Sequence, residues 1–408
     1  MNNYRVLFSL RVLKNILTSF VDSFLILYFL DISSSNILPL GIYKLVAIFA
    51  IYGVMFFVRN LCKSKHRVNL IRIGIILNFI YFLTIILLKE NVVNYIYLVG
   101  LLYGLEEGFY YSVYNNIESD GITNDERAKF IGNYTAVQSI LSIVFPLIFG
   151  GLIYATGFIK SLIVVLVIVI IQIILSFMIK DNNIPKTSRT NLKKFRNIAK
   201  NNNEIMQVYK MRFFSGLTYS EGAFSYIVTI YIIKVFSNSV SLGIFTSVFS
   251  LISAILGILF AKYIKQKQYN SIIKVSMFFT IISLLAMIYK CNMITIILFN
   301  LCKTFSKGLM DLINTSRKKN PKTNKEIIKN EYKVEYWLGI EGSLFIGRAI
   351  SNTLFILMAF TDVNVMIYIF ALFLALLAIN SIKLQKVMQE QEKEKLGVLN
   401  NGTTKSRL

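Results

Sequence analysis

Residues 181–203 read DNNIPKTSRTNLKKFRNIAKNNN, an Asn-rich and basic stretch in a chain that is otherwise strongly apolar. Of the 408 residues, 55% are hydrophobic and 16% are charged, whereas a typical soluble domain carries about 25% charged residues. The mean hydropathy is +0.60. This composition excludes an ordinary soluble enzyme and predicts a chain that is solvated by lipid.

Apolar stretches of about 20 residues, the length of helix that crosses a bilayer core, lie on both sides of this basic segment. Six precede it and six follow it, at 8–30, 37–58, 70–88, 92–115, 130–154, 159–179, 211–235, 240–261, 271–289, 292–315, 334–359 and 363–382. The first is too long for a cleaved signal peptide and has no small-residue cleavage site, so we expect it to remain as a span. We predict an N-terminal six-helix bundle at 1–180, a cytoplasmic basic linker at 181–203, a C-terminal six-helix bundle at 204–387 and a cytoplasmic polar tail at 388–408.

The distribution of Lys and Arg predicts how the chain is oriented. With the N-terminus in the cytoplasm, the cytoplasmic segments hold 36 of the 44 basic residues, three of them in the N-terminal stretch, and the outer turns hold five, among them Lys44. Cytoplasmic loops of membrane proteins carry such an excess. We therefore expect a multi-pass protein of the cytoplasmic membrane with both termini in the cytoplasm, and no nucleic-acid partner for the net charge of +23.

The basic segment itself contains a possible short helix. Leu192, Phe195 and Ala199 would share one face of it, and the neighbouring Lys and Arg side chains could rest on anionic lipid headgroups. A solvated basic loop is the open alternative.

The two halves of the chain carry related sequences. Leu40-Gly41-Ile42-Tyr43 matches Leu242-Gly243-Ile244-Phe245 at an offset of 202, and Gly108, Thr123, Asn124 and Glu126 match Gly308, Thr323, Asn324 and Glu326 at an offset of 200. Duplicated halves are typical of transporters, in which a site at the repeat interface opens to either side of the membrane.

This layout, with a basic loop after the second span and a proline and paired glycines in the fifth, resembles the major facilitator superfamily over nearly the whole chain. The loop reads Arg59-Asn60-Leu61-Cys62-Lys63-Ser64-Lys65-His66-Arg67 and lacks the acidic residue of the family pattern. The fifth span reads Phe145-Pro146-Leu147-Ile148-Phe149-Gly150-Gly151 and lacks the first glycine of the exporter pattern. The chain is similar to uncharacterised members from low-GC Gram-positive bacteria, which implies no particular solute. The resemblance implies an all-α fold of twelve transmembrane helices in two pseudo-symmetric six-helix bundles, with spans 1, 4, 7 and 10 lining a central cavity and spans 5 and 11 bordering it.

Ionisable residues inside the predicted spans fall on these cavity helices. They are Asp22, Glu106, Glu107, Glu221, Lys303, Lys307, Asp311, Glu341 and Arg348. Such groups are costly in lipid and survive where they face a cavity or a partner. Helical spacing places Lys303, Lys307 and Asp311 on one face of the tenth span, and Glu341 and Arg348 on one face of the eleventh. A purely structural Lys307–Asp311 ion pair is an open alternative.

The fourth span contains two adjacent acids, and Glu107 shares a face with tyrosines. Two neighbouring carboxyls in a low dielectric cannot easily both ionise, so one is expected to keep its proton. We predict that Asp22, Glu106, Glu107 and Glu221 couple transport to protons. The predicted substrate-binding residues are Tyr103, Tyr111, Tyr114, Lys303, Lys307, Asp311, Glu341 and Arg348. Alternatively, Glu106 pairs with Lys303 or Arg348 and holds the two halves together.

These features favour a secondary transporter that moves a small organic solute by alternating access, coupled to protons, as a monomer and with export favoured. The alternatives are a proton-coupled importer of an anionic or zwitterionic nutrient, such as an amino acid, peptide or sugar derivative, and a lipid scramblase or sensor on the same fold. No enzyme, cofactor or metal site is expected, because Cys62, Cys291, Cys302 and the single histidine, His66, form no ligand-spaced cluster.

Overall fold

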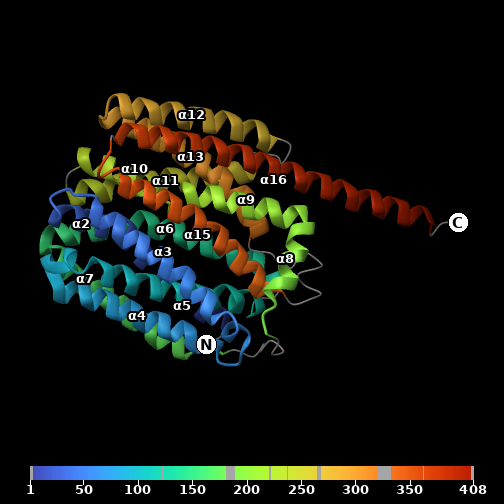
Figure 1. Ribbon diagram of the computed structural model, residues 1–408, viewed down its shortest axis with the longest axis horizontal. Helices are drawn as coiled ribbons and strands as arrows, with labels where there is room; N and C mark the ends of the chain where they lie inside the picture. The colour runs from blue at the N-terminus through green and yellow to red at the C-terminus, as the bar shows by residue number, and fades with distance from the viewer. Residues whose placement is uncertain are drawn as a thin grey trace.

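The computed structural model of the protein describes residues 3–121, 124–180, 189–219, 222–236, 238–263, 268–318, 332–361 and 363–405. These residues form helices and short connections without a strand (Figure 1). The first half contains α1 (Asn3–Phe20), a π-helix η1 (Val21–Leu25), α2 (Ile26–Ile32), α3 (Leu38–Val58), η2 (Leu61–Lys63), α4 (Arg67–Leu88), η3 (Lys89–Val93), α5 (Ile96–Gly121), α6 (Asn124–Thr156) and α7 (Phe158–Phe177). The second half contains α8 (Leu192–Asn201), α9 (Asn203–Leu217), α10 (Ala223–Val235), α11 (Ser239–Tyr263), α12 (Tyr269–Tyr289), α13 (Met293–Lys318), α15 (Lys333–Leu357) and α16 (Val363–Lys405).

Every predicted span coincides with a helix or with two or three helical segments in succession, which confirms the predicted fold class. Among the described residues, nine helical stretches are long and apolar enough to cross a membrane. The three remaining spans are α5, the pair α9 and α10, and α13. α5 and α13 carry ionisable residues, and the span made of α9 and α10 is interrupted. All three belong to the spans for which the family resemblance implies a cavity-facing side.

The seventh span differs from the prediction of one helix over 211–235. α9 begins at Asn203, where the Asn202 side chain accepts a hydrogen bond from the Ile205 N–H at 3.1 Å, and ends at Leu217. α10 begins only at Ala223. The hydroxyl of Ser351 on α15 accepts from the Ala223 N–H at 2.8 Å and donates to the Leu217 carbonyl at 3.1 Å. The break is stable in an apolar setting because a neighbouring helix pairs these two backbone groups.

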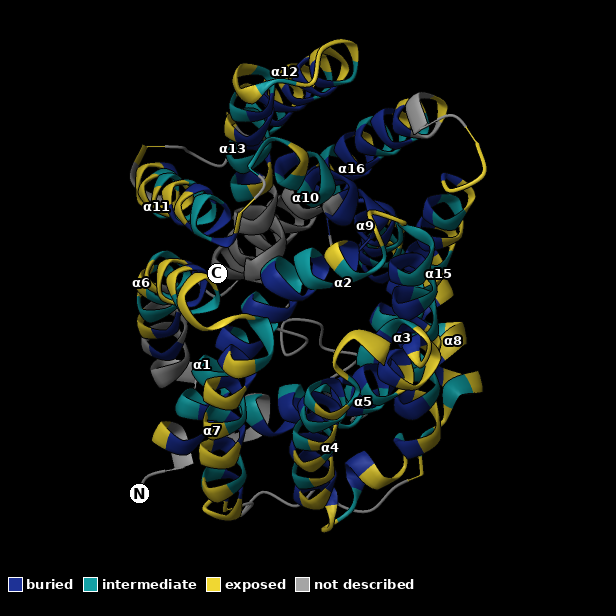
Figure 2. Ribbon diagram, turned by 90° about the vertical axis from the view of Figure 1, so that its left-hand side faces the viewer, coloured by how far each residue is buried: buried dark blue, intermediate teal, exposed yellow. Residues whose placement is uncertain are grey.

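Helices of the two halves meet along two seams, which Figure 2 shows end-on: α6 lies beside α11, and α3 lies beside α15. Glycines allow the first seam to close, since a Cβ on Gly243 would lie 2.5 Å from the Pro146 carbonyl oxygen. In the second seam, the rings of Tyr52 and Phe345 stack at 4.7 Å. The division of the chain at residues 180 and 203 stays a prediction.

The short helix predicted in the basic segment is present as α8. The Asn191 side chain accepts from the Lys194 N–H at 3.0 Å and caps its first turn. Phe195 and Ala199 are buried, and the Phe195 ring lies 5.8 Å from that of Tyr332. Phe195 and Ala199 therefore pack against the rest of the protein, whereas Leu192 on the same face is only half-buried. At the other end of the chain, α16 continues through the predicted polar tail to Lys405 and projects beyond the other helices (Figure 1).

Candidate substrate cavity

A cavity of about 610 Å³ lies between the two halves, and it is lined from both of them. The first half contributes α1, η1, α3 and α5, and the second half contributes α9, α10, α13, α15 and the break between α9 and α10. The lining residues are Arg11, Thr18, Asp22, Ser23, Ile51, Met55, Glu107, Tyr111, Asn115, Arg212, Tyr219, Tyr226, Thr229, Lys303, Lys307, Trp337, Glu341 and Arg348. The volume is that of a typical small-molecule site, which is about 300–1,000 Å³.

Most of the residues predicted for the site reach this cavity. Those in its lining are Asp22, Glu107, Tyr111, Lys303, Lys307, Glu341 and Arg348. Glu106, Tyr103 and Tyr114 are outside the lining. Glu221 falls outside the described residues, and so does the side chain of Asp311, although its backbone belongs to α13.

The two adjacent acids of α5 share one lysine from α1. The Lys14 Nζ lies 2.8 and 2.7 Å from the two carboxylate oxygens of Glu106 and 2.7 Å from Oε1 of Glu107. All three side chains are buried, with Glu106 and Lys14 only 2% and 3% exposed. The alternative pairing of Glu106 with Lys303 or Arg348 is wrong, because the partner of Glu106 is Lys14, within the same half. Three ionised groups give this cluster a net charge of −1, and one proton would make it neutral.

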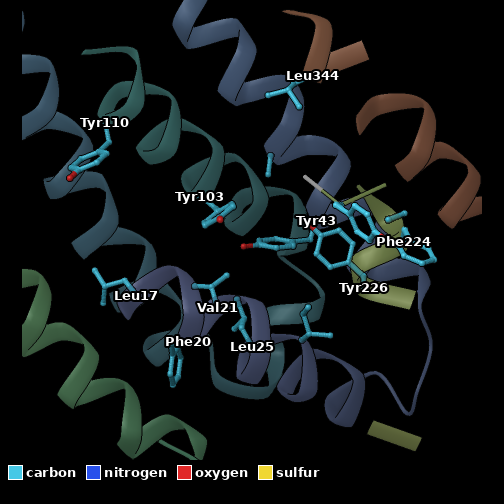
Figure 3. Close-up of a cluster of buried hydrophobic side chains, with 14 of the residues drawn as sticks. Leu17, Phe20, Val21, Leu25, Tyr43, Tyr103, Tyr110, Phe224, Tyr226 and Leu344 are labelled. Atoms are coloured by element: carbon cyan, nitrogen blue, oxygen red, sulfur yellow. The ribbon is translucent and has the colours of Figure 1, made fainter. Parts of the chain in front are cut away.

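Two of the predicted binding tyrosines, Tyr103 and Tyr114, lie outside the cavity lining and pack between helices. The Tyr103 ring lies 5.7 Å from the ring of Tyr43 and 5.5 Å from that of Tyr81, and Figure 3 shows Tyr103 directed toward Tyr43. The Tyr114 hydroxyl donates to the Leu7 carbonyl at 2.7 Å and so ties α5 to α1. Of the three tyrosines, Tyr111 alone lines the cavity.

Asp22 lies in the π-helix η1 of the first span, and its partner is Lys44, which the sequence predicts at an outer turn. Lys44 is in fact buried in α3, with its Nζ 3.7 Å from an Asp22 carboxylate oxygen and 4.5 Å from the centre of the Tyr226 ring. The Asp22 side chain is 44% exposed, so this pair is partly solvated. π-turns are rare and frequent at functional sites.

The wall contributed by the second half is mainly cationic. Arg348 lies 3.9 Å from Glu341, which confirms the shared face predicted from their spacing. Lys303 and Lys307 lie four residues apart on α13, and within the described part of the chain neither makes an ion pair. Arg212 of α9 completes this wall. The described lining from the second half therefore contains four basic residues and one acid, Glu341.

At one end of the cavity, polar contacts join the halves. The Lys63 Nζ lies 2.9 Å from Oε1 of Glu335, which is fully buried at the start of α15. The Asn191 N–H donates to the same oxygen at 2.9 Å, and the Thr190 hydroxyl donates to Asn60 at 2.7 Å. The segment before α8, the loop after α3 and the first turn of α15 are thereby linked.

The loop cysteine beside these contacts offers a test of whether this end opens. Burial raises the pKa of the Cys62 thiol to about 11. A buried thiol with a small thiolate fraction reacts slowly, so we expect N-ethylmaleimide to modify Cys62 at pH 7.5 at least about tenfold more slowly than the exposed Cys291. Mass spectrometry of two variants, one keeping Cys62 alone and one keeping Cys291 alone, measures both rates.

Loss of the ion pair should then accelerate this labelling. Lys63→Gln removes the partner of Glu335, whereas Lys65→Gln changes an exposed lysine of the same loop. We expect faster modification of Cys62 in the first variant only. Equal rates in both variants would contradict a role for the Lys63–Glu335 pair in closing this end.

The comparisons with known proteins agree with this arrangement. Residues 15–302 match the family model of the Major Facilitator Superfamily. An uncharacterised protein of Bacillus subtilis (strain 168), YqgE, is 24% identical over 239 residues, which is 57% of this chain and 54% of the relative, so the match spans about half of that protein.

Two solved structures share the fold. A single-residue mutant of the nucleoside transporter NupG superposes with a TM-score of 0.64 at 14% identity and covers 94% of this chain and 100% of its own. The human organic anion transporter MFSD10 (TETRAN) superposes with a TM-score of 0.59 at 11% identity, over 93% and 99% of the two chains. The two structures show the fold alone, and the family match points to a multi-pass membrane transporter rather than an enzyme: the chain belongs to the Major Facilitator Superfamily.

Proposed function

We propose that the protein is a proton-coupled secondary transporter of a small organic anion or zwitterion, and that the solute binds in the cavity between the halves. The observation that carries the proposal is the cationic wall of the second half, where Lys303 and Lys307 lie without an ion pair among the described side chains. Charged groups within a membrane protein are costly unless a partner offsets them. A carboxylate or phosphate on the solute would supply that partner.

The first half of the cavity supports a solute that also carries a positive or polar group. Asp22 and Glu107 reach the cavity from this side, and Thr18 and Ser23 add hydroxyls. A zwitterion could therefore place its two charges on opposite walls. One of the structural neighbours is named an organic anion transporter, but at 11% identity that likeness concerns the fold. The proposed class of solute is therefore argued from the cavity residues.

Proton coupling is supported by the cluster of Lys14, Glu106 and Glu107. Its net charge of −1 favours uptake of one proton, and Glu107 gives that proton a route to the cavity because it belongs to both the cluster and the lining. A carboxyl that changes its protonation as solvent access switches can link solute movement to a proton gradient. We assign the coupling role to Glu107, with Lys14 and Glu106 setting the charge around it.

Three further parts of the proposal rest on sequence analysis alone. These are the cytoplasmic membrane as the location, cytoplasmic termini, and a monomer as the working unit. Export also stays a prediction, because the cavity residues select the charge of a solute and not the direction of its gradient.

Neutralising the two lysines tests the choice of solute. Purified protein is screened by thermal shift against carboxylates, phosphorylated sugars, amino acids and organic cations at pH 6 and pH 8, since a ligand of the folded state raises the melting temperature. We expect anions or zwitterions to give the largest shifts. The variant Lys303→Gln/Lys307→Gln should weaken their binding at least about tenfold, the effect of losing roughly 1.4 kcal/mol.

Lys290→Gln is the matched control, because Lys290 is an exposed lysine at the end of α12 and away from the cavity. It should leave the shifts unchanged. If organic cations alone stabilise the protein, and the double variant binds them as well as the parent or better, the proposed solute class is wrong.

A further inference from the structure

A second hollow lies at the side of the molecule and shares no lining residue with the central cavity. It has a volume of about 400 Å³ and is bounded by α3, α8, α9 and α15. Most of its lining is apolar or aromatic, including Tyr52, Phe56, Leu192, Phe195, Met206 and Leu338. This lateral groove thus presents an apolar floor where the linker helix α8 covers the α3–α15 seam.

The charged residues of the lateral groove give it a positive rim. Arg196 and Lys200 are exposed and lie four residues apart on α8, so both project from one side of that helix. The acid in the lining, Glu335, is buried and already paired with the Lys63 ammonium and the Asn191 N–H, both at 2.9 Å. The rim therefore attracts anions, and the acid below it is already neutralised.

We propose that the lateral groove binds one anionic phospholipid, with an acyl chain along the apolar floor and the phosphate between Arg196 and Lys200. A free phosphate would leave the floor uncovered, whereas an acyl chain buries apolar surface along it. A zwitterionic lipid carries no net charge for the rim to attract. Basic side chains at the cytoplasmic face of a membrane recognise anionic headgroups in this way, and the segment containing α8 is predicted to lie on that face.

Binding in this groove would also favour one conformation. The lipid contacts α3 from the first half, α15 from the second and the linker helix between them. A ligand that binds only while these helices are together stabilises that arrangement. Phosphatidylglycerol should therefore slow the alkylation of Cys62, which lies in η2, directly after α3.

Native mass spectrometry of the purified full chain tests the binding directly. Dioleoyl-phosphatidylglycerol and dioleoyl-phosphatidylcholine are added separately to protein in a non-ionic detergent. We expect one phosphatidylglycerol to be retained, and Arg196→Gln/Lys200→Gln to weaken this binding about 30-fold, the effect of losing two phosphate contacts. Met206→Trp, which fills the floor, should weaken it as well.

Lys194→Gln is the control, since Lys194 is an exposed lysine two residues before Arg196 and six before Lys200, spacings that place it on another side of α8. It should bind phosphatidylglycerol as the parent does. The proposal is overturned if Arg196→Gln/Lys200→Gln binds phosphatidylglycerol as tightly as Lys194→Gln does, if phosphatidylcholine binds equally well, or if Met206→Trp has no effect. The conformational part is overturned if phosphatidylglycerol binds but leaves the alkylation rate of Cys62 unchanged.

Discussion

Replacing Lys14 with methionine is expected to destabilise the folded protein by about 3–5 kcal/mol, the cost of leaving buried charge without its partner. The Lys14 ammonium lies within 2.8 Å of both Glu106 and Glu107, and all three side chains are buried. Methionine keeps the length and apolar character of the lysine stem but removes its charge.

Two variants separate this effect from ordinary packing damage. Lys14→Met/Glu106→Gln/Glu107→Gln removes all three charges at similar volume and should recover most of the lost stability. Lys44→Met removes another buried lysine, but its partner Asp22 is 44% exposed and can be solvated by water, so the cost should be smaller. Melting temperatures from size-exclusion chromatography after heating measure all three. A triple variant that melts as low as Lys14→Met would contradict the charge argument.

The positions of the spans could be predicted from the sequence because the length and hydropathy of a helix in lipid are set by the bilayer. The break in the seventh span could not, because it depends on Ser351, which is more than one hundred residues away and pairs the backbone of Leu217 and Ala223. Hydropathy describes each segment in isolation, and a neighbouring helix decides whether an interruption is satisfied.

The ionisable side chains could be assigned to the cavity helices, but their partners could not. By the distribution of basic residues, Lys14 belongs to the cytoplasmic N-terminal stretch and Lys44 to an outer turn, whereas both side chains are buried ion-pair partners. A signal was present in the first span, where Arg11, Thr18 and Asp22 recur at spacings of seven and four and all line the cavity. Which side of a helix faces the cavity depends on how the helix is rotated about its axis, and the sequence does not give that rotation. Tyr111 of α5 therefore lines the cavity, whereas Tyr103 and Tyr114 pack against other helices.

Glu107→Gln is expected to abolish the accumulation of solute against its gradient in proteoliposomes, while exchange down a gradient continues. A difference of two pH units supplies about 2.7 kcal/mol per proton, which corresponds to about 100-fold accumulation for one proton per solute. Glutamine keeps the size and the hydrogen-bonding capacity of the side chain but cannot carry the proton between the two sides. The measurement is the ratio of internal to external labelled solute, taken with the pH gradient imposed in either direction.

Asp22 and Glu107 are the two predicted coupling residues that line the described cavity. The variant Asp22→Asn tests which of them carries the proton. Asp22 has its own cation, Lys44, in a pair that carries no net charge and therefore gains little from a proton. The cluster around Lys14 holds one negative charge in excess, so a proton there removes a buried charge, whereas a proton on Asp22 would leave Lys44 without its partner. We therefore expect the Asp22→Asn protein to keep a proton-driven gradient. Loss of accumulation in Asp22→Asn with full accumulation in Glu107→Gln would move the coupling site to the first span.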